Sequence, residues 1–157
     1  MGFVSTGYIP NIVGLLLCEA GSSVATGPSQ MESKQQRRDG RGPRVLVVDD
    51  EKLVADSLSA ILKRFHFDAE PCYSGESAIE AARQECPDYV LSDVMMPKLN
   101  GVETVLTIQK ICPGARVILL SGNAATADLL NDARSEGHEF ELLAKPIHPD
   151  ELLRRLT

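Results

Sequence analysis

The stretch RVLVVDD, residues 44–50, is a continuous run of apolar, mostly β-branched side chains that ends in two aspartates. An apolar run without polar alternation is typical of a strand that is buried on both faces in the middle of a parallel sheet. Apolar residues at helical spacing follow it over residues 51–65 and predict an amphipathic helix. This part of the chain is therefore predicted to form a βα unit.

The same alternation repeats along the rest of the chain. We predict further strands at residues 67–72, 89–93, 116–120 and 140–143, and further helices at residues 74–85, 102–111, 124–135 and 150–156. Pro71 places its strand towards an edge, because proline has no N–H to give to a neighbouring strand. Five βα units predict an α/β fold, with a doubly wound five-stranded parallel sheet and helices on both faces.

Composition and charge exclude several classes of protein. The chain has 157 residues, of which 43% are hydrophobic, and a formal net charge of −6. Such an apolar fraction excludes a wholly disordered chain, and the length suits one domain of ordinary size. The acidic balance argues against a nucleic-acid binder, because these carry basic patches.

Residues 1–43 differ from the rest because they are rich in Gly and Ser and lack the βα alternation. We expect them to be an N-terminal extension without a packed core, and residues 44–157 to be the domain. The apolar run Ile12–Cys18 is too short for a membrane span, which needs about 20 residues. Met31 is an alternative start of translation. If translation begins there, residues 1–30 come from a start codon that was assigned too early.

The four cysteines are Cys18, Cys72, Cys86 and Cys112, and they form no CxxC pair. This spacing argues against a structural zinc site, and scattered single cysteines suit a reducing compartment better than a disulfide framework. We therefore interpret all four as small apolar fillers and expect a cytoplasmic protein.

Polar side chains stand at the ends of four predicted strands: Asp49–Glu51, Asp93, Ser121 and Lys145. Each alone is typical of a turn or a helix cap, but the carboxyl ends of parallel strands meet at one edge, where ligands bind. Two carboxylates about 4 Å apart repel by about 4 kcal/mol at an effective dielectric constant of about 20. Lys145 supplies one compensating charge, and Mg²⁺ with a phosphate-bearing substrate suits the remaining oxygens.

Four motifs carry a resemblance to a known family. VLVVDDE (45–51), LSDVMMPKLNG (91–101), LLSG (119–122) and AKP (144–146) resemble, in order and in spacing, the receiver domain of bacterial two-component response regulators, the CheY-like superfamily. The resemblance covers residues 44–157. It implies a flavodoxin-like sheet with strand order 2-1-3-4-5.

The resemblance also implies a role for each residue at the strand ends. Asp93 matches the aspartate that accepts the phosphoryl group, and Ser121 and Lys145 match the residues that bind its oxygens. The magnesium ligands are implied to be Asp49 acting through water, Asp50, Asp93 and the backbone carbonyl of Met95. The Lys145–Pro146 peptide bond matches one that is usually cis in the family.

The implied function is a Mg²⁺-dependent signalling switch rather than a turnover enzyme. A sensor histidine kinase or a phosphotransfer protein would donate the phosphoryl group, and the phosphorylated domain would change its contacts with a downstream protein. No output domain and no direct nucleic-acid contact are expected in this chain, and whether two copies associate is left open. The switch aromatic of the family would be Phe140, because its usual position holds Leu142, or both residues are simply part of the core.

Two other functions fit the predicted fold less well. An aspartate-nucleophile phosphohydrolase would carry a second aspartate two residues after Asp93 as its acid and base, and here that residue is Met95. A nucleotide- or flavin-binding module would carry a GxGxxG motif or a glycine-rich phosphate loop, and the sequence has neither.

Deleting residues 1–30 should leave both thermal stability and phosphorylation unchanged, because the predicted core begins at Arg44. Thermal unfolding and acetyl-phosphate labelling of the two chain lengths would check this expectation. A loss of more than a few degrees would instead show that the extension packs on the domain.

Overall fold

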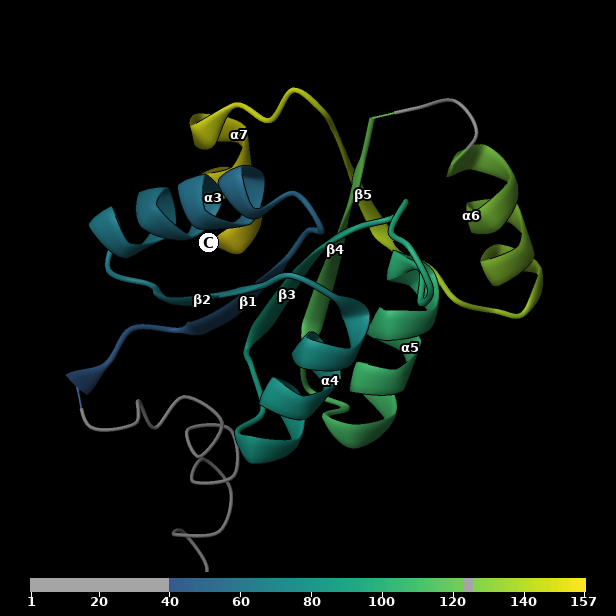
Figure 1. Ribbon diagram of the computed structural model, residues 1–157, viewed down its shortest axis with the longest axis horizontal. Coiled ribbons are helices and arrows are strands. Elements are labelled where there is room, and N and C mark those ends of the chain that lie inside the picture. The colour runs from purple at the N-terminus through teal and green to yellow at the C-terminus, as the bar shows by residue number, and fades with distance from the viewer. Residues whose placement is uncertain (1–39, 123–125) are drawn as a thin grey trace, which may run out of the picture. The chain divides into compact units, whose positions relative to one another are not determined.

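The computed structural model describes residues 40–122 and 126–157. The expectations for residues 1–39, and for the beginning of the helix predicted at residue 124, lie outside this part of the chain. In the described residues the sheet has five strands, all parallel, in the order β2-β1-β3-β4-β5 (Figure 1). The strands are β1 (Arg44–Val48), β2 (Asp68–Cys72), β3 (Tyr89–Asp93), β4 (Arg116–Ser121) and β5 (Glu141–Ala144). The predicted fold class and strand order are confirmed.

Helices cover both faces of this sheet (Figure 1). They are α3 (Lys52–Arg64), α4 (Gly75–Gln84), α5 (Gly101–Ile111), α6 (Thr126–Ser135) and α7 (Pro149–Leu156). One apolar cluster contains buried residues of α3 and α7, and the other contains buried residues of α4, α5 and α6. The sheet is therefore the middle layer of three, as the alternating pattern predicts.

The first strand explains why its sequence shows no polar alternation. Val45 and Val47 pack in the cluster beneath α3 and α7, whereas Leu46 and Val48 pack in the cluster beneath α4 and α5. All four side chains are fully buried. Since neighbouring residues of a strand point to opposite faces, a central strand with helices on both sides must be apolar throughout.

The element ends follow local chemistry. Ser74 caps α4 and accepts a hydrogen bond from the backbone N–H of Ser77, and Asn100 caps α5 in the same way through the N–H of Glu103. Pro149 occupies the first turn of α7, where its missing N–H has no helical partner to lose, so the helix begins one residue before the predicted start. β2, which contains Pro71, is an edge strand as predicted.

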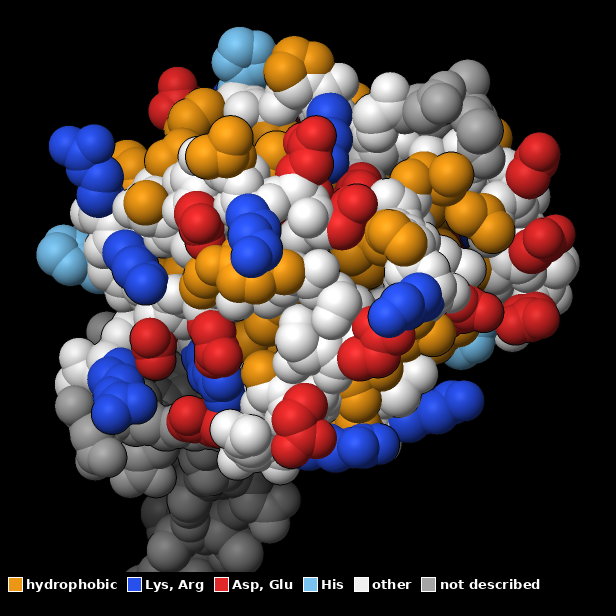
Figure 2. Space-filling model, in the orientation of Figure 1, with side chains coloured by type: hydrophobic (Ala, Val, Ile, Leu, Met, Phe, Trp, Pro, Cys, Tyr) orange, Lys and Arg blue, Asp and Glu red, His pale blue; other side chains and the backbone are white. Residues whose placement is uncertain are grey.

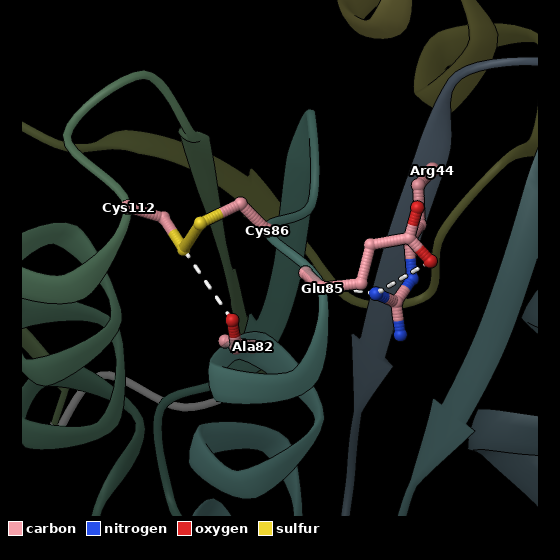
Figure 3. The surroundings of a disulfide bond; sticks show 5 residues. All are labelled: Arg44, Ala82, Glu85, Cys86 and Cys112. Atoms are coloured by element: carbon pink, nitrogen blue, oxygen red, sulfur yellow. Dashed lines mark hydrogen bonds and ion pairs between the residues drawn. A yellow bond between two sulfur atoms is a disulfide. The ribbon is translucent and has the colours of Figure 1, made fainter. Parts of the chain in front are cut away.

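The interpretation of all four cysteines as unpaired fillers is wrong, because Cys86 and Cys112 form a disulfide (Figure 3). Cys86 follows α4 and Cys112 follows α5, and the Cα atoms of the two residues are 5.6 Å apart. The two helices pack side by side and end at the same level. The sequence does not reveal this proximity, because the two cysteines are 26 residues apart. Cys72 is a buried thiol in the core, and burial raises its pKa to about 12.

The disulfide lies beside an ion-pair cluster at the amino ends of the strands (Figure 3). The guanidinium group of Arg44, the first residue of β1, pairs with the carboxylates of Glu70 and Glu85 and donates to the backbone carbonyl of Glu85. Glu85 immediately precedes Cys86. This end of the sheet is thus tied by one covalent bond and by charge pairs between β1, β2 and the end of α4.

Replacing both Cys86 and Cys112 by alanine should lower the free energy of unfolding by about 3.5 kcal/mol, the loop-closure term for a loop of this length. Urea unfolding measured without reductant would test this. The unsubstituted protein should lose the same amount when a reductant is added, whereas Cys72→Ala should remain sensitive to reductant. A urea midpoint that is independent of reductant in the unsubstituted protein would contradict the pairing.

Candidate functional site

Three carboxylates meet where β1 and β3 end. Asp49 and Asp50 follow β1 directly, and Asp93 is the last residue of β3. One carboxylate oxygen from each of the three lies within 4.8 Å of the others. Asp49 is 1% exposed and Asp93 8%, whereas Asp50 is exposed to solvent. The parallel register that pairs Val48 with Ser92 brings these residues together.

Lys145 reaches the same site from the end of β5. Its Nζ donates a hydrogen bond of 2.8 Å to Asp49 Oδ2 and lies 3.3 Å from Asp93 Oδ1. Its backbone N–H donates to the carbonyl oxygen of Ser121 at 2.7 Å, which fixes it against the end of β4. The peptide bond that follows, Lys145–Pro146, is cis as the resemblance implies.

Burial and neighbouring charges shift the pKa values of two groups in the site. Burial is the main cause that raises the pKa of Asp93, and the charges of Asp49 and Asp50 raise it further, whereas Lys145 acts in the opposite direction. Burial of Lys145 lowers its pKa, but the hydrogen bond to Asp49 and the charges of Asp93 and Asp49 outweigh burial, so the pKa is raised. Lys145 therefore stays cationic, and one ammonium faces three carboxylates.

This donor set fits a hard divalent cation. Carboxylate oxygens are the ligands that Mg²⁺ prefers in proteins, and a cation would offset the charge that Lys145 leaves unbalanced. Asp49 is already engaged at both oxygens, since Oδ1 accepts from the N–H of Glu51 at 2.9 Å and Oδ2 accepts from Lys145. Asp50 is open to solvent, and Met95 is half-exposed at the beginning of the loop after β3.

Ser121 ends β4 at the same edge of the sheet, in register with Ala144. Its hydroxyl donates a hydrogen bond of 2.9 Å to the hydroxyl of Thr126, the first residue of α6. Thr126 could not be identified from the sequence, because a threonine at the beginning of a helix has no distinctive signature. A second hydroxyl shortly after the serine at the end of β4 is the only signal that the sequence offered.

The two switch candidates have different environments. Phe140 packs against the cluster that contains α4, α5 and α6, and its ring stacks on His138 with centroids 6.2 Å apart. Leu142 lies in β5 and is 39% exposed. The alternative that both are core residues therefore does not hold for Leu142, whereas Phe140 is partly buried against that cluster.

An open cavity of 420 Å³ lies next to the carboxylates. It is lined by Asp50, Tyr73, Ser74, Glu76, Met96, Pro97 and Lys98. Two exposed apolar side chains follow the acidic residues in sequence, namely Leu53, which is 82% exposed, and Met95, which is 50% exposed. Hydrophobic side chains also lie among charged ones across the face of the molecule in Figure 2. The surroundings of the site thus combine a hollow with apolar side chains that face water.

Comparison with known proteins agrees with the fold. Residues 45–157 match the response regulator receiver domain, and the chain belongs to this family. The probable transcriptional regulatory protein TcrX of Mycobacterium tuberculosis is 34% identical over 121 residues, which cover 77% of this chain and 51% of TcrX. The chemotaxis protein CheY of Thermotoga maritima is 29% identical over 117 residues, 74% of this chain and 96% of CheY.

Solved structures give the same assignment. A two-component transcriptional regulator AraC from Clostridium phytofermentans has a TM-score of 0.64 at 36% identity, covering 73% of this chain and 90% of that one. The CheX-CheY-BeF3-Mg complex from Borrelia burgdorferi has a TM-score of 0.64 at 27% identity, covering 74% of this chain and 88% of that one. The chain spans about half the length of TcrX and of the similar DNA-binding response regulator MtrA. It is a CheY-like receiver domain, a class that acts as a signalling switch.

Asp93→Asn should stabilise the protein in the absence of divalent cations at pH 7. The pKa of Asp93 is higher in the folded chain than in the unfolded one, so its ionisation lowers stability as the pH rises through these two values. The stabilisation should shrink as the pH falls towards 3.8, the ordinary pKa of an aspartate. Urea unfolding in a chelating buffer at several pH values would measure it.

Added Mg²⁺ should make the unsubstituted protein more stable than Asp93→Asn, because only the protein with all three carboxylates binds the cation well. At a Mg²⁺ concentration ten times the dissociation constant, the gain for the unsubstituted protein is about 1.4 kcal/mol. Asp132→Asn, which removes an exposed carboxylate of α6, is the matched control and should change neither measurement. If Mg²⁺ stabilised Asp93→Asn as much as it stabilised Asp132→Asn, a cation site at Asp93 would be contradicted.

Proposed function

We propose that this chain is a phosphorylation-controlled switch that accepts a phosphoryl group on Asp93 in a Mg²⁺-dependent reaction. The observation that carries the proposal is the group of three carboxylates, Asp49, Asp50 and Asp93, with Lys145 hydrogen-bonded among them. The family assignment supports it, since receiver domains act as signalling switches. The relative from Borrelia burgdorferi is described in a complex with BeF3 and Mg, which is consistent with such a site.

The chemistry would begin with the carboxylate of Asp93. One of its oxygens forms a bond to phosphorus while the bond from phosphorus to the donor breaks, and the electron pair of that bond leaves with the donor. Lys145 would hold its ammonium beside the transferred oxygens, since its Nζ already lies 3.3 Å from Asp93 Oδ1. The hydroxyl of Ser121 would bind another of these oxygens. Positioning and charge neutralisation provide most of the acceleration in such a transfer.

The residues that would hold the cation differ in their roles. Asp50, Asp93 and the backbone carbonyl of Met95 are proposed as direct ligands, and Asp49 as a ligand through water. This division is consistent with the two hydrogen bonds that Asp49 already accepts, one at each oxygen. When bound, Mg²⁺ supplies positive charge to the oxygens of the phosphoryl group.

A switch fits the site better than a turnover enzyme. A phosphohydrolase needs an acid and base near its nucleophile, and the thioether of Met95 can be neither. The donor is proposed to be a phosphohistidine on a sensor kinase or a phosphotransfer protein, reached through the cavity beside Asp50. Leu53 and Met95 are suited to contact that partner because they are apolar and exposed.

The signal is proposed to pass to a downstream protein in the cytoplasm rather than directly to nucleic acid. MtrA is described as a DNA-binding response regulator, and this chain matches about half of its length. The net charge of −6 over the whole chain disfavours direct contact with DNA. No helix in the described part of the chain is long and apolar enough to cross a membrane.

Incubation with Mg²⁺ and acetyl phosphate should add one phosphoryl group, which intact-protein mass spectrometry would detect. Asp93→Asn should abolish the added mass, because an amide is not a nucleophile for this transfer. Asp132→Asn should be labelled as fully as the unsubstituted protein, since its carboxylate lies on the outer side of α6. Labelling that persists in Asp93→Asn would overturn the assignment of the acceptor.

A further inference from the structure

The disulfide between Cys86 and Cys112 joins two segments that lie at the ends of their helices. Cys86 follows Glu85, the C-cap residue of α4, and Cys112 is the C-cap residue of α5. Cys112 is 3% exposed, whereas Cys86 is half-buried. A thiolate in solution therefore reaches the sulfur of Cys86 more easily than that of Cys112. The bond is asymmetric, with one sulfur open to attack and the other placed to leave.

The structure also has a suitable place for each sulfur when the bond is broken. The Sγ of Cys112 lies in the apolar cluster that contains α4, α5 and α6, and it is 3.5 Å from the carbonyl oxygen of Ala82 (Figure 3). A thiol at Cys112 can donate its proton to that oxygen, which a disulfide sulfur cannot do. A thiol at Cys86 keeps partial access to water. Reduction therefore buries no charge and leaves the proton of Cys112 with an acceptor.

The backbone next to each cysteine is held by other interactions. The guanidinium group of Arg44 pairs with the carboxylate of Glu85 and donates to its backbone carbonyl, immediately before Cys86. The backbone N–H of Cys112 donates to the carbonyl of Ile108 at 2.7 Å. These contacts keep the two cysteines close to each other after reduction, so the bond can form again in the folded protein.

The other ends of α4 and α5 are held together without a covalent bond. A Cβ atom on Gly75, the first residue of α4, would lie 2.2 Å from the Oγ1 of Thr104 and 3.0 Å from a methyl group of Leu99. The first turn of α4 comes this close to α5 because Gly75 has no side chain. Ser74 and Glu76, on either side of Gly75, line the cavity. Packing therefore fixes the helix pair at the cavity end, and the disulfide fixes it at the other end.

We propose that Cys86 and Cys112 form a redox-active site, which undergoes exchange with low-molecular-weight thiols and disulfides while the domain stays folded. Reduction releases the ends of α4 and α5 that carry the cysteines and leaves the cavity end in place. The inference goes beyond the proposed function and does not depend on phosphoryl transfer to Asp93. It agrees with the cytoplasmic location proposed above, because disulfides in cytoplasmic proteins are usually transient or redox-sensing.

The exchange has two steps, with a low-molecular-weight thiol as the reductant. Its thiolate forms a bond to the Sγ of Cys86 while the bond between the two protein sulfurs breaks, and the electron pair leaves with the Sγ of Cys112, which takes up a proton. A second thiolate then bonds to the reductant's sulfur in this mixed disulfide, and the Sγ of Cys86 leaves and is protonated. Two thiols are oxidised to one disulfide, and the protein disulfide is reduced to two thiols. The reverse reaction, with the low-molecular-weight disulfide as the oxidant, restores the bond.

Glutathione buffers without denaturant test whether the site reacts in the folded protein. The protein is equilibrated at increasing ratios of reduced to oxidised glutathione and pulsed with iodoacetamide, and peptide mapping then distinguishes the four cysteines. Alkylation of Cys86 should rise with the ratio, and Cys86 should react faster than the more buried Cys112. Cys72 is a buried thiol, so it should stay unlabelled as long as the domain is folded.

Two results of this titration would overturn the proposal. If Cys86 stays in its disulfide with Cys112 at every ratio and is released only when urea unfolds the domain, the bond is purely structural. If Cys72 becomes labelled together with Cys86, the bond is reduced only in the unfolded protein. Return of the disulfide when reduced protein is moved into oxidised glutathione is the expected result for a reversible site.

Hydrogen exchange tests which end of the helix pair is released. In the reduced protein, the amides of residues 82–88 and 108–115 should exchange about tenfold faster than in the oxidised protein, because no covalent bond opposes their local opening. Residues 75–79 and 99–104 should exchange equally in both states. The double variant Cys86→Ala/Cys112→Ala should behave like the reduced protein in either buffer. Equal exchange at residues 82–88 in the oxidised and reduced proteins would contradict the release.

Gly75→Ala is the matched control for the cavity end. Its added methyl group would meet Thr104, so exchange at residues 99–104 should become faster in both redox states. The dependence of Cys86 alkylation on the glutathione ratio should stay as in the unsubstituted protein. A changed dependence would contradict the independence of the two ends.

Labelling by acetyl phosphate separates this inference from the proposed function. Both the oxidised and the reduced protein should be labelled, because the cavity end of the helix pair is held in place without the disulfide. If neither is labelled, the proposed function fails, and the glutathione titration still decides the redox site. If only the reduced protein loses labelling, the release extends to the cavity, and the independence of the two ends is overturned.

Discussion

Repulsion between carboxylates at the ends of β1 and β3 is the constraint on which the site depends. The sheet register brings Asp49 and Asp93 together in the interior, and Asp50 adds a third charge at the surface. Water cannot screen the two buried charges well, so a cation must offset them. Lys145 does so in part, and the remaining imbalance favours a divalent ion and the group that it neutralises. The electrostatics that disfavour this cluster in isolation would thus favour the proposed binding of a cation and an anion together.

The two ends of the sheet are built differently. The carboxyl ends of the strands hold like charges, an open cavity and exposed apolar side chains. The amino ends hold the disulfide between Cys86 and Cys112 and the ion pairs of Arg44. If the proposed switch changes contacts at the carboxyl ends, the tied amino ends can keep the domain folded, and the two requirements do not compete for the same residues.

Fold and site could be predicted from this sequence to different extents. Residues such as Leu46 and Val47 determine the fold locally. A continuous apolar run that alternates with helical patterns is compatible with few folds other than a parallel sheet covered by helices. Asp93 and Lys145 could be placed together because strand ends converge wherever the strands are parallel. The pairing of Cys86 with Cys112 could not be predicted, because it depends on two helices ending at the same level. The partnership of Ser121 with Thr126 depends on how α6 packs, which no local pattern records.

Pro71 has a consequence for how copies of this domain meet. In β2 the N–H of Asp68 and the carbonyl of Cys72 both bond towards β1, so the alternation of the strand turns Pro71 outward along the open edge. A proline there leaves a gap in the row of donors that another strand would need for continuous pairing. Edge-to-edge growth of the sheet into fibres is discouraged on this side, and partners must be recognised through side chains rather than through the backbone.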